Sequence, residues 1–312
     1  MFNNVLSLFD GISCGQIALN RAGISYNTYY ASEIDKYAIK VTQQHFPQTI
    51  QLGDVTQVRG ENLPKIDLLM GGSPCQGFSW SGKRLNFDDP RSKLFFEFVR
   101  LLKECKPKYW FLENVVMRKD FEQTITSYIE VEPVMINSAL VSAQSRPRLY
   151  WANFPITQPV DKGVKLSDIL EDTTMPNKAT IIGRRLNSKG RREDYNKKIP
   201  ITQCLEVRAS NRDKSNCLTT VAKDTVLTSL PIGRYPDVFR KKLPFRYYTV
   251  KECCRLQTIP DDYFDGIVSE NQAMKMIGNG WTVDVIVHIL RDILKTNSFR
   301  EKLSETNTIQ ME

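Results

Sequence analysis

The first 156 residues alternate short apolar runs with amphipathic stretches, and this alternation is what most constrains the fold. The apolar runs, which have the composition of β-strands, are residues 5–8, 28–31, 66–70, 109–112 and 149–154. The stretches with apolar side chains at helical spacing are residues 16–21, 35–45 and 93–105. Strands that alternate with helices predict an α/β fold around a doubly wound, largely parallel sheet. Ligands bind such sheets where the strands end, so functional residues are expected there.

The remainder of the chain divides into two parts. Residues 157–244 lose the periodicity and are rich in Asn, Ser, Thr, Gly and basic residues, which predicts a smaller, loop-rich domain with little core and short strands such as residues 217–221. Residues 245–312 return to helical spacing, at 249–256, 272–277 and 283–293. We therefore expect three segments, 1–156, 157–244 and 245–312, of which the third rejoins the first.

The net charge of +8 lies in the middle segment. Residues 157–244 hold 18 Lys and Arg against 10 Asp and Glu, so this segment accounts for the whole excess. The basic residues are densest at Arg184, Arg185, Lys189, Arg191, Arg192, Lys197 and Lys198. A single basic run is often only a solvated face. A whole segment that holds the entire excess favours a polyanion as the partner.

Several classes of protein are not expected. The chain has seven cysteines and no C-x-x-C pair, which argues against a disulfide framework and against a zinc or other metal site. It has no run of about 18 apolar residues that could cross a membrane. Its N-terminus reads as a strand, because no basic stretch precedes the apolar run as in a signal peptide. A reducing cytoplasm is the expected compartment.

Small and acidic residues follow the first three strands. Residues 8–15, Leu-Phe-Asp-Gly-Ile-Ser-Cys-Gly, include small residues that let a ligand approach the backbone and a helix N-terminus. Glu33 follows the next strand, about 20 residues on, where a carboxylate can accept hydrogen bonds from a ribose. Asp54, in Leu-Gly-Asp-Val at residues 52–55, stands at a further strand end and could accept a hydrogen bond from an adenine amino group. Each acid alone would be read as a surface residue, but the three positions together favour an adenosine ligand.

A cysteine follows the strand predicted at residues 66–70, in Gly-Gly-Ser-Pro-Cys-Gln-Gly-Phe-Ser at residues 71–79. Free cysteines are commonly small buried hydrophobic residues. The loop after Cys75 is too polar for that, since residues 76–91 include Gly77, Lys83 and Arg84. Positive charge near a thiol favours the thiolate. Cys75, held by Pro74, is therefore a candidate nucleophile.

Two further motifs offer charged side chains. In Phe-Leu-Glu-Asn-Val, at residues 111–115, Glu113 ends a central strand, where a partly desolvated carboxyl can hold a proton; the alternative is a helix cap. In Gln-Ser-Arg-Pro-Arg, at residues 144–148, Arg146 and Arg148 stand two apart as a strand begins. Residues i and i+2 of a strand share a face, so both arginines could enter one pocket. A surface pair is the alternative.

The order of these motifs resembles the DNA cytosine-5 methyltransferase family. Phe-x-Gly, Pro-Cys-Gln, Glu-Asn-Val and Gln-x-Arg-x-Arg are followed by Arg-Leu-Gln-x-x-Pro and Gly-Asn, and together they cover nearly the whole chain apart from the basic segment. Residues 7–12, 133–136 and 278–283 are similar to the de novo methyltransferases of animals. With no extra chromatin-reading domain, the bacterial and phage type is favoured.

The resemblance implies a fold, a cofactor and a partner. The fold is that of S-adenosylmethionine-dependent methyltransferases, with residues 1–156 as catalytic and cofactor-binding domain, 157–244 as target-recognition domain and 245–312 as helices that complete the first. The cofactor is S-adenosyl-L-methionine, the product S-adenosyl-L-homocysteine, and the substrate duplex DNA. A cognate restriction endonuclease is a candidate partner, and the nucleoid the expected place of action. Neither the DNA target nor the oligomeric state can be read from the sequence.

The resemblance also assigns residues. Cys75 is the nucleophile, Glu113 contacts cytosine at ring nitrogen-3 and the exocyclic amine, and Arg146 and Arg148 orient the base. The implied cofactor-binding residues are Phe9, Asp10, Gly11, Glu33, Ile34, Asp54, Val55, Pro74, Asn279 and Trp281. The expected DNA contacts are Gln76, Ser81, Lys83, Arg84, Arg191, Arg192, Lys197 and Lys198. The family's usual acid in the first strand is replaced by Ser7, and a Gly-Gly pair by Ser13 and Cys14, so the chain departs from the family's pattern at these cofactor contacts.

Three other functions compete with this one. A tRNA cytosine-5 methyltransferase has the same catalytic set, but the Cys-Phe-Thr-type signature expected of that subfamily is missing. A catalytically inactive DNA-binding regulator is disfavoured by the intact Cys75, Glu113 and Arg146. An NAD-dependent oxidoreductase would share the sheet and the ribose acid, yet has no use for Pro-Cys-Gln or Glu-Asn-Val.

Overall fold

The computed structural model describes residues 1–74, 90–208 and 213–309, and within them two sheets. The larger has seven strands in the order β3-β2-β1-β4-β5-β7-β6. Their bounds are β1 Phe2–Leu8, β2 Tyr26–Ser32, β3 Ile50–Gln51, β4 Leu68–Gly72, β5 Tyr109–Val115, β6 Val134–Asn137 and β7 Pro147–Ala152. Strands β1 to β5 pair in parallel, and β7 pairs antiparallel with both β5 and β6. The predicted doubly wound, largely parallel sheet is confirmed.

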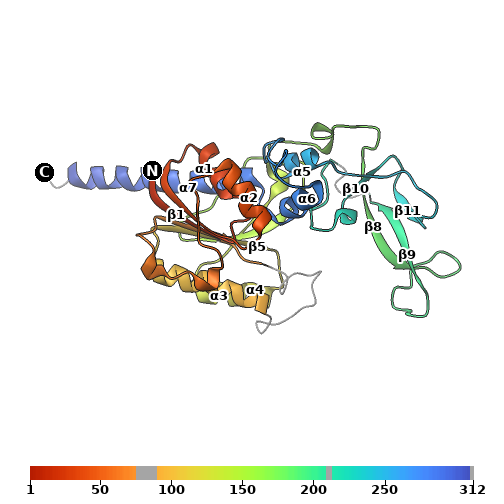
Figure 1. Cartoon of the computed structure of the whole chain (residues 1–312), viewed down its shortest axis with the longest axis horizontal. Helices are drawn as coiled ribbons and strands as arrows, with labels where there is room; N and C mark the ends of the chain where they lie inside the picture. Colours follow the sequence, from red (N-terminus) through yellow and green to blue (C-terminus); the bar gives the residue numbers. More distant parts are fainter. Residues whose placement is uncertain (75–89, 209–212, 310–312) are drawn as a thin grey trace.

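Helices cover both faces of this sheet (Figure 1). One face carries α1 Cys14–Ala22, α2 Lys36–His45 and α7 Val283–Ile309, and the other carries α3 Pro90–Cys105 and α4 Lys119–Ile129. Two buried clusters correspond to the two faces. In β1, Val5 belongs to one cluster and its neighbour Leu6 to the other, as the period of two in a strand requires. Helix α7 packs along α1, which returns the end of the chain to the sheet.

Local signals set several helix ends. Helix α1 ends at Gly23, which has φ 72°, a left-handed conformation that favours glycine. Asp35 accepts a hydrogen bond from the Tyr37 amide at 2.9 Å and begins α2. Capping boxes begin α5 Val250–Leu256, at Thr249 and Glu252, and α6 Glu270–Asn279. Helices α5 and α6 lie between the two sheets (Figure 1).

The smaller sheet was not predicted as such. It is antiparallel, in the order β11-β9-β8-β10-β12, with bounds β8 Asn177–Arg185, β9 Ile201–Val207, β10 Val226–Thr228, β11 Gly233–Pro236 and β12 Arg246–Tyr247. It stands apart from the larger sheet, at the end of the molecule opposite the end of α7 (Figure 1). Its buried cluster is small, Ala179, Ile181, Leu205, Val207, Val226 and Val238. The expectation of little core is confirmed.

One predicted strand is wrong, and three elements of the larger sheet and its cover were not among the predicted strands and helices. Residues 217–221 form no strand, because side chains rather than a neighbouring strand bind the backbone there: Gln144 accepts from the Leu218 amide at 2.7 Å, and Arg146 donates to the Leu218 carbonyl at 2.8 Å. Strands β3 and β6 and helix α4 complete the larger sheet and its cover.

Candidate active site

A pocket of about 360 Å³ opens where β1, β2, β4 and β5 end. Every predicted catalytic or cofactor-binding residue in the described part of the chain lines it: Phe9, Asp10, Gly11, Glu33, Ile34, Asp54, Val55, Pro74, Glu113, Arg146, Arg148, Asn279 and Trp281. Cys75, Gln76, Ser81, Lys83 and Arg84 lie outside the described residues. The carboxyl ends of parallel strands meet at one edge, which is why positions far apart in sequence share the pocket.

At one end of the pocket, the turn after β1 is tied to the end of β2. The Gly11 amide donates to Glu33 Oε2 at 2.8 Å, and Glu33 Oε1 accepts from the amides of Ile34 and Asp35 at 2.7 and 2.8 Å. Gly11 has φ 58°, and a Cβ added to it would meet nothing within 4 Å. Backbone conformation therefore favours glycine there, while the space in front of it is open.

Asp10 is buried beneath this turn. Its carboxylate accepts from the Ser13 hydroxyl and from the Tyr29 hydroxyl, each at 2.7 Å. Burial raises the pKa of Asp10 to about 6, although these hydrogen bonds act in the opposite direction. Asp10 thus supports the turn through the hydrogen bonds of its carboxylate.

Asp54 and Ile34 form the outer part of the same end. Asp54 begins a short 3-10 helix, Val55–Gln57, by accepting from the Thr56 amide at 2.9 Å. Ile34 is 76% exposed although it is apolar, and it lines the pocket. An exposed apolar side chain beside an acid can pack on a flat aromatic group whose polar edge the acid binds.

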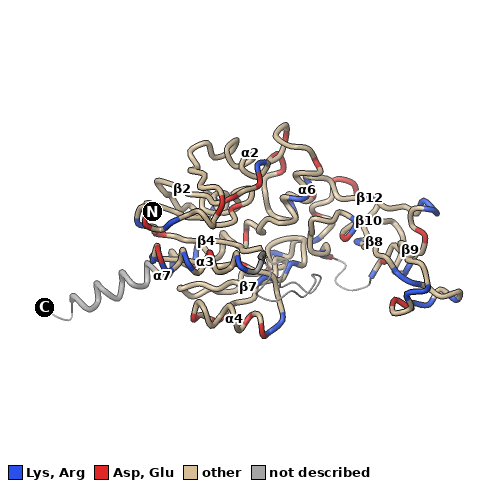
Figure 2. Tube along the Cα trace, turned by 60° about the horizontal axis from the view of Figure 1, so that its bottom comes forward, with Lys and Arg blue, Asp and Glu red and all other residues tan. Residues whose placement is uncertain are grey.

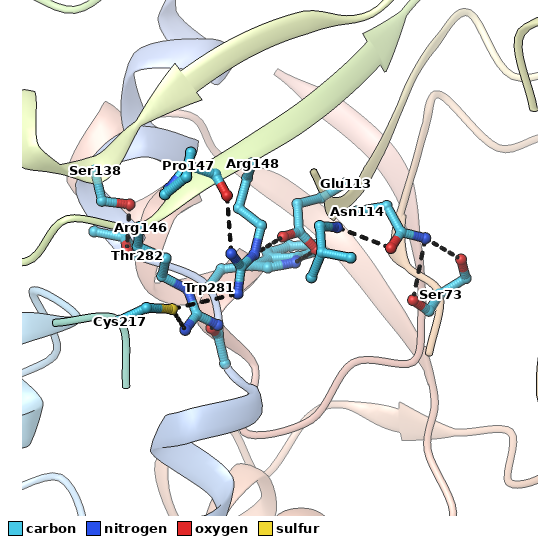
Figure 3. Close-up of polar contacts among 12 residues, drawn as sticks. Ser73, Glu113, Asn114, Ser138, Arg146, Pro147, Arg148, Cys217, Trp281 and Thr282 are labelled. Atoms are coloured by element: carbon cyan, nitrogen blue, oxygen red, sulfur yellow. Dashed lines mark hydrogen bonds and ion pairs between the residues drawn. The ribbon is translucent and has the colours of Figure 1, made fainter. Parts of the chain in front are cut away.

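Glu113 stands at the other end of the pocket and is held from two sides (Figure 3). Its Oε1 lies 3.0 Å from Arg148 Nε, and its Oε2 accepts from Trp281 Nε1 at 3.1 Å. Only 8% of Glu113 is exposed. Because α4 begins at Lys119, Glu113 does not cap that helix, and the alternative interpretation of this residue is wrong. Gly72 pairs with Glu113 in the neighbouring strand. A side chain at position 72 would collide with the indole, because its Cβ would lie 2.7 Å from Trp281 Nε1.

Arg146 and Arg148 do share the pocket, but they use their guanidinium groups differently. Arg148 faces Glu113, whereas the buried Arg146 donates to the carbonyls of Leu218, Gly278 and Gly280 at 2.8, 3.1 and 3.0 Å. Burial above all, and then the charge of Arg148, lower the pKa of Arg146. Arg146 therefore joins β7 to the end of α6 and to the segment that enters the second sheet.

A buried polar network behind the pocket was missed by the sequence analysis. Gln257 donates to the carbonyls of Ile277 and Gly280 at 2.9 and 3.0 Å, and Thr282 donates to Gln257 Oε1 at 2.7 Å. These bonds fix the backbone on both sides of Trp281. The signal was present, because Gln257 is the glutamine of Arg-Leu-Gln, although its partners could not be inferred from the motif.

A second missed contact precedes the candidate nucleophile. Asn114, which follows Glu113 in β5, is buried and donates to Ser73 Oγ at 2.9 Å and to the Ser73 carbonyl at 3.4 Å. The same Asn114 side chain accepts from the Val115 amide at 2.8 Å (Figure 3). The backbone that leads into Pro74 is thereby attached to the strand that carries Glu113.

The predicted DNA contacts of the middle segment lie on the connection between β8 and β9. Arg191, Arg192, Lys197 and Lys198 are exposed there, and Arg192 forms an ion pair with Asp194. Arg184, counted in the same basic run, is buried and pairs with Glu206 at 2.9 Å and with Asp194 at 3.3 Å. Its charge is therefore compensated inside the protein, and the accessible basic surface is smaller than the sequence predicts.

Comparison with known proteins decides the family. A family model described as C-5 cytosine-specific DNA methylase matches residues 3–151 and 134–295. The chain belongs to this family. The methyltransferase is 30% identical to the type II methyltransferase M1.ScrFI of Lactococcus lactis subsp. cremoris, over 93% of this chain and 78% of that protein. It is 26% identical to the type II methyltransferase M.FnuDI of Fusobacterium nucleatum, over 96% of this chain and 97% of that protein.

A solved structure supports the same assignment for the fold. A DNMT2 mutant of Spodoptera frugiperda superimposes with a TM-score of 0.65 at 19% identity, over 94% of this chain and 99% of that chain. The predicted family, its bacterial type and the methyltransferase fold are confirmed. The animal structure is a DNMT2, and its likeness to this chain concerns the fold alone, so the predicted similarity to the animal de novo methyltransferases stays a prediction. The chain is a DNA cytosine methyltransferase, and its family implies S-adenosylmethionine as methyl donor and duplex DNA as substrate. Across the described residues, no helix is long and apolar enough to cross a membrane.

Proposed function

We propose that this methyltransferase acts on a cytosine flipped out of a specific duplex sequence, and methylates its carbon-5 through a covalent bond to Cys75. One observation supports the proposal most. A single pocket holds the acids and open backbone suited to an adenosine ligand, at Gly11, Glu33 and Asp54, together with the charged pair Glu113 and Arg148. A methyl donor and a base could therefore meet within it.

The residues at the first end fit S-adenosyl-L-methionine. A carboxylate has about four acceptor positions, and three on Glu33 are taken by backbone amides, which leaves one for a ribose hydroxyl. Asp54 would accept from the adenine amino group, with Ile34, Phe9 and Val55 as the remaining contacts of the adenosine. When bound, the cofactor supplies an electrophilic methyl group on a sulfonium, and S-adenosyl-L-homocysteine is the product.

The residues at the second end fit cytosine. The Cys75 thiolate would add to carbon-6, and the electrons of the 5,6 double bond would then make carbon-5 nucleophilic. Negative charge that develops at ring nitrogen-3 would be neutralised by a proton transferred through Glu113 as the thiolate adds, with the Arg148 guanidinium 3.0 Å from Glu113 Oε1. After methylation, loss of the carbon-5 proton and expulsion of the Cys75 thiolate would restore the ring. The base must leave the stack first, because a stacked duplex hides both carbons.

The three segments would share the work on DNA. Residues 1–156 and 245–312 would form the catalytic unit, since Arg146 and Trp281 meet in one pocket, and residues 157–244 would recognise the target. Phosphate contacts would come from the exposed basic residues between β8 and β9, and from Gln76, Ser81, Lys83 and Arg84. By analogy with its type II relatives, a restriction endonuclease of the same specificity would be the partner, at the nucleoid of a bacterial or phage-infected cell.

Covalent trapping tests the proposal. Bisulfite sequencing of DNA from cells that express the chain identifies the target, and a duplex with 5-fluorocytosine at that position should trap the wild type and Cys105→Ser but not Cys75→Ser. The Cys75→Ser protein should still bind S-adenosylmethionine in calorimetry. Methylation of tRNA instead of DNA would contradict the substrate. An adduct on another thiol would contradict the nucleophile, and Cys217, whose sulfur lies 3.3 Å from Arg146, is the rival that peptide mapping would reveal.

A further inference from the structure

A hollow of about 340 Å³ lies at one end of the second sheet, away from the basic connection between β8 and β9. It is formed where β8 begins, where β9 ends and where the chain approaches β11. Its lining combines two cations with apolar walls and one amide: Lys178, Arg208, Val207, Pro231, Ile232 and Asn177. Neither cation was singled out by the sequence analysis, and the catalytic site does not use them.

Lys178 has no evident structural purpose in this hollow. It is 8% exposed, and its ammonium has no hydrogen bond or ion pair with any part of the chain that the structure describes. Burial lowers the pKa of Lys178, and no acidic neighbour counteracts that effect. A lysine whose side chain is largely buried without an acceptor among the described residues has lost part of its hydration, and an acceptor supplied by a ligand would give its ammonium a partner.

Arg208 is held in place by an acid on the same face, two residues before it in the chain. Its Nη2 donates to Glu206 Oε2 at 3.0 Å, and Glu206 Oε1 accepts from Arg184 and Arg234 at 2.9 Å each. Hydrogen bonds from Arg184 above all, then from Arg208 and Arg234, lower the pKa of Glu206 to about 2. The Arg208 side chain is nevertheless 66% exposed, so Glu206 orients the guanidinium, and its other N–H groups form no hydrogen bond with the residues that the structure describes.

The hollow lies on the face of the sheet that leads to the active site. Thr180 pairs with Glu206, so Lys178 and Arg208, two residues along each antiparallel strand, extend the same face. Asn216 donates to Thr180 Oγ1 at 3.2 Å, and the next residue, Cys217, contacts Arg146. Figure 2 shows Lys and Arg, interspersed with Asp and Glu, around β8, β9 and their connection. A duplex whose cytosine reaches the pocket would pass close to this face.

We infer that Lys178 and Arg208 read a guanine of the target sequence, by donating hydrogen bonds to its N7 and O6 in the major groove. Both side chains only donate, and guanine is the base that presents two acceptors together on that edge. The apolar walls suit the edge of a base pair, whereas a phosphate would keep its water and gain nothing from Val207, Pro231 and Ile232. This inference rests on the proposed role of residues 157–244 in target recognition.

Selection of bound DNA tests the inference without requiring catalysis. Duplexes captured from a randomised library by the wild type should show a guanine at one position, and Lys178→Met should lose that preference while the rest of the sequence is kept. Replacing this guanine by 7-deazaguanine, which lacks the N7 acceptor, should weaken wild-type binding about tenfold and leave binding by Lys178→Met unchanged. Lys241→Met, which removes an exposed lysine of the same domain, is the matched control and should behave like the wild type.

Several results would overturn the inference. One is a Lys178→Met protein that selects the same sequence as the wild type. Another is uniformly weaker binding to all sequences with a reduced salt dependence, which is the behaviour of a phosphate contact. A wild-type protein that binds all sequences equally would also overturn the inference. Should Lys178→Met unfold, Arg208→Met is the second variant, since Arg208 is largely exposed and must relax the same position. Failure of the proposed function would be separate, because it appears as missing methylation whatever DNA is selected.

Discussion

Replacing Trp281 by Phe should slow catalysis without weakening cofactor binding, although the sequence places Trp281 among the cofactor contacts. In the structure the indole N–H donates to Glu113 Oε2 at 3.1 Å, and the ring packs on Phe111 with 5.7 Å between centroids. Phenylalanine keeps an aromatic ring at this position and removes the donor. Among the described residues only Arg148 would then hold Glu113, which would lose its alignment toward the base.

The magnitude follows from the kind of bond. A hydrogen bond to a charged group contributes about 1.5–3 kcal/mol, and Glu113 is too buried for water to replace the missing donor easily. If that loss falls on the transition state, kcat should drop roughly 10- to 150-fold. The affinity for S-adenosylmethionine should stay within about threefold, because the indole N–H serves Glu113 and not the adenosine end of the pocket.

Methyl transfer and calorimetry together measure both quantities. Transfer of a labelled methyl group to the target duplex gives kcat, and calorimetry gives the cofactor Kd. Trp151→Phe is the matched control, since Trp151 Nε1 donates to Thr126 Oγ1 at the same 3.1 Å but lies outside the pocket lining. It should lower stability and leave kcat nearly unchanged. A Trp281→Phe enzyme with wild-type kcat and a raised cofactor Kd would refute the reasoning, and return Trp281 to the role that the sequence predicts.

The remaining predictions concern charge. The pKa of Asp10, raised by burial from 3.8 to about 6, means that its stabilising contribution is complete below pH 3.8 and is lost as the pH rises through 6. Relative to Asp10→Asn, the wild type should therefore lose about 2.4 kcal/mol of unfolding free energy between pH 4 and pH 8 in urea titrations, and a difference that does not vary with pH would contradict this. Neutralising Arg191, Arg192, Lys197 and Lys198 with Gln should reduce the log–log salt slope of duplex binding by roughly 0.9 for each phosphate that the protein no longer neutralises, and leave the methylated sequence the same. Arg192→Gln should have less effect than Arg191→Gln, because an acid already pairs with Arg192; equal effects would show that this ion pair opens on DNA.

The catalytic half of the molecule was readable from local pattern. Periods of two and 3.6 identify strands and helices wherever one face of an element is buried, as Val5 and Leu6 illustrate by belonging to opposite faces. Parallel connection then forces the strand ends to one edge, so Glu33, Asp54 and Glu113 had to meet there. The second sheet was not readable, because β10, β11 and β12 have only three, four and two residues, and because β8 and β9, although longer, lack the regular apolar alternation that marks a strand.

The sequence by itself determined the fold class, the family and the residues that line the pocket, because these depend on local periodicity and on motif order. The tertiary structure alone decided what those residues do to one another. Trp281 reaches Glu113 across 168 residues, and Arg146 gives its donors to backbone carbonyls as far as Gly280. Arg184 is buried in ion pairs, whereas Lys178 is buried without one among the described residues. Hydrogen-bond partners and burial depend on which backbones pack together after folding, and no spacing within a motif specifies that.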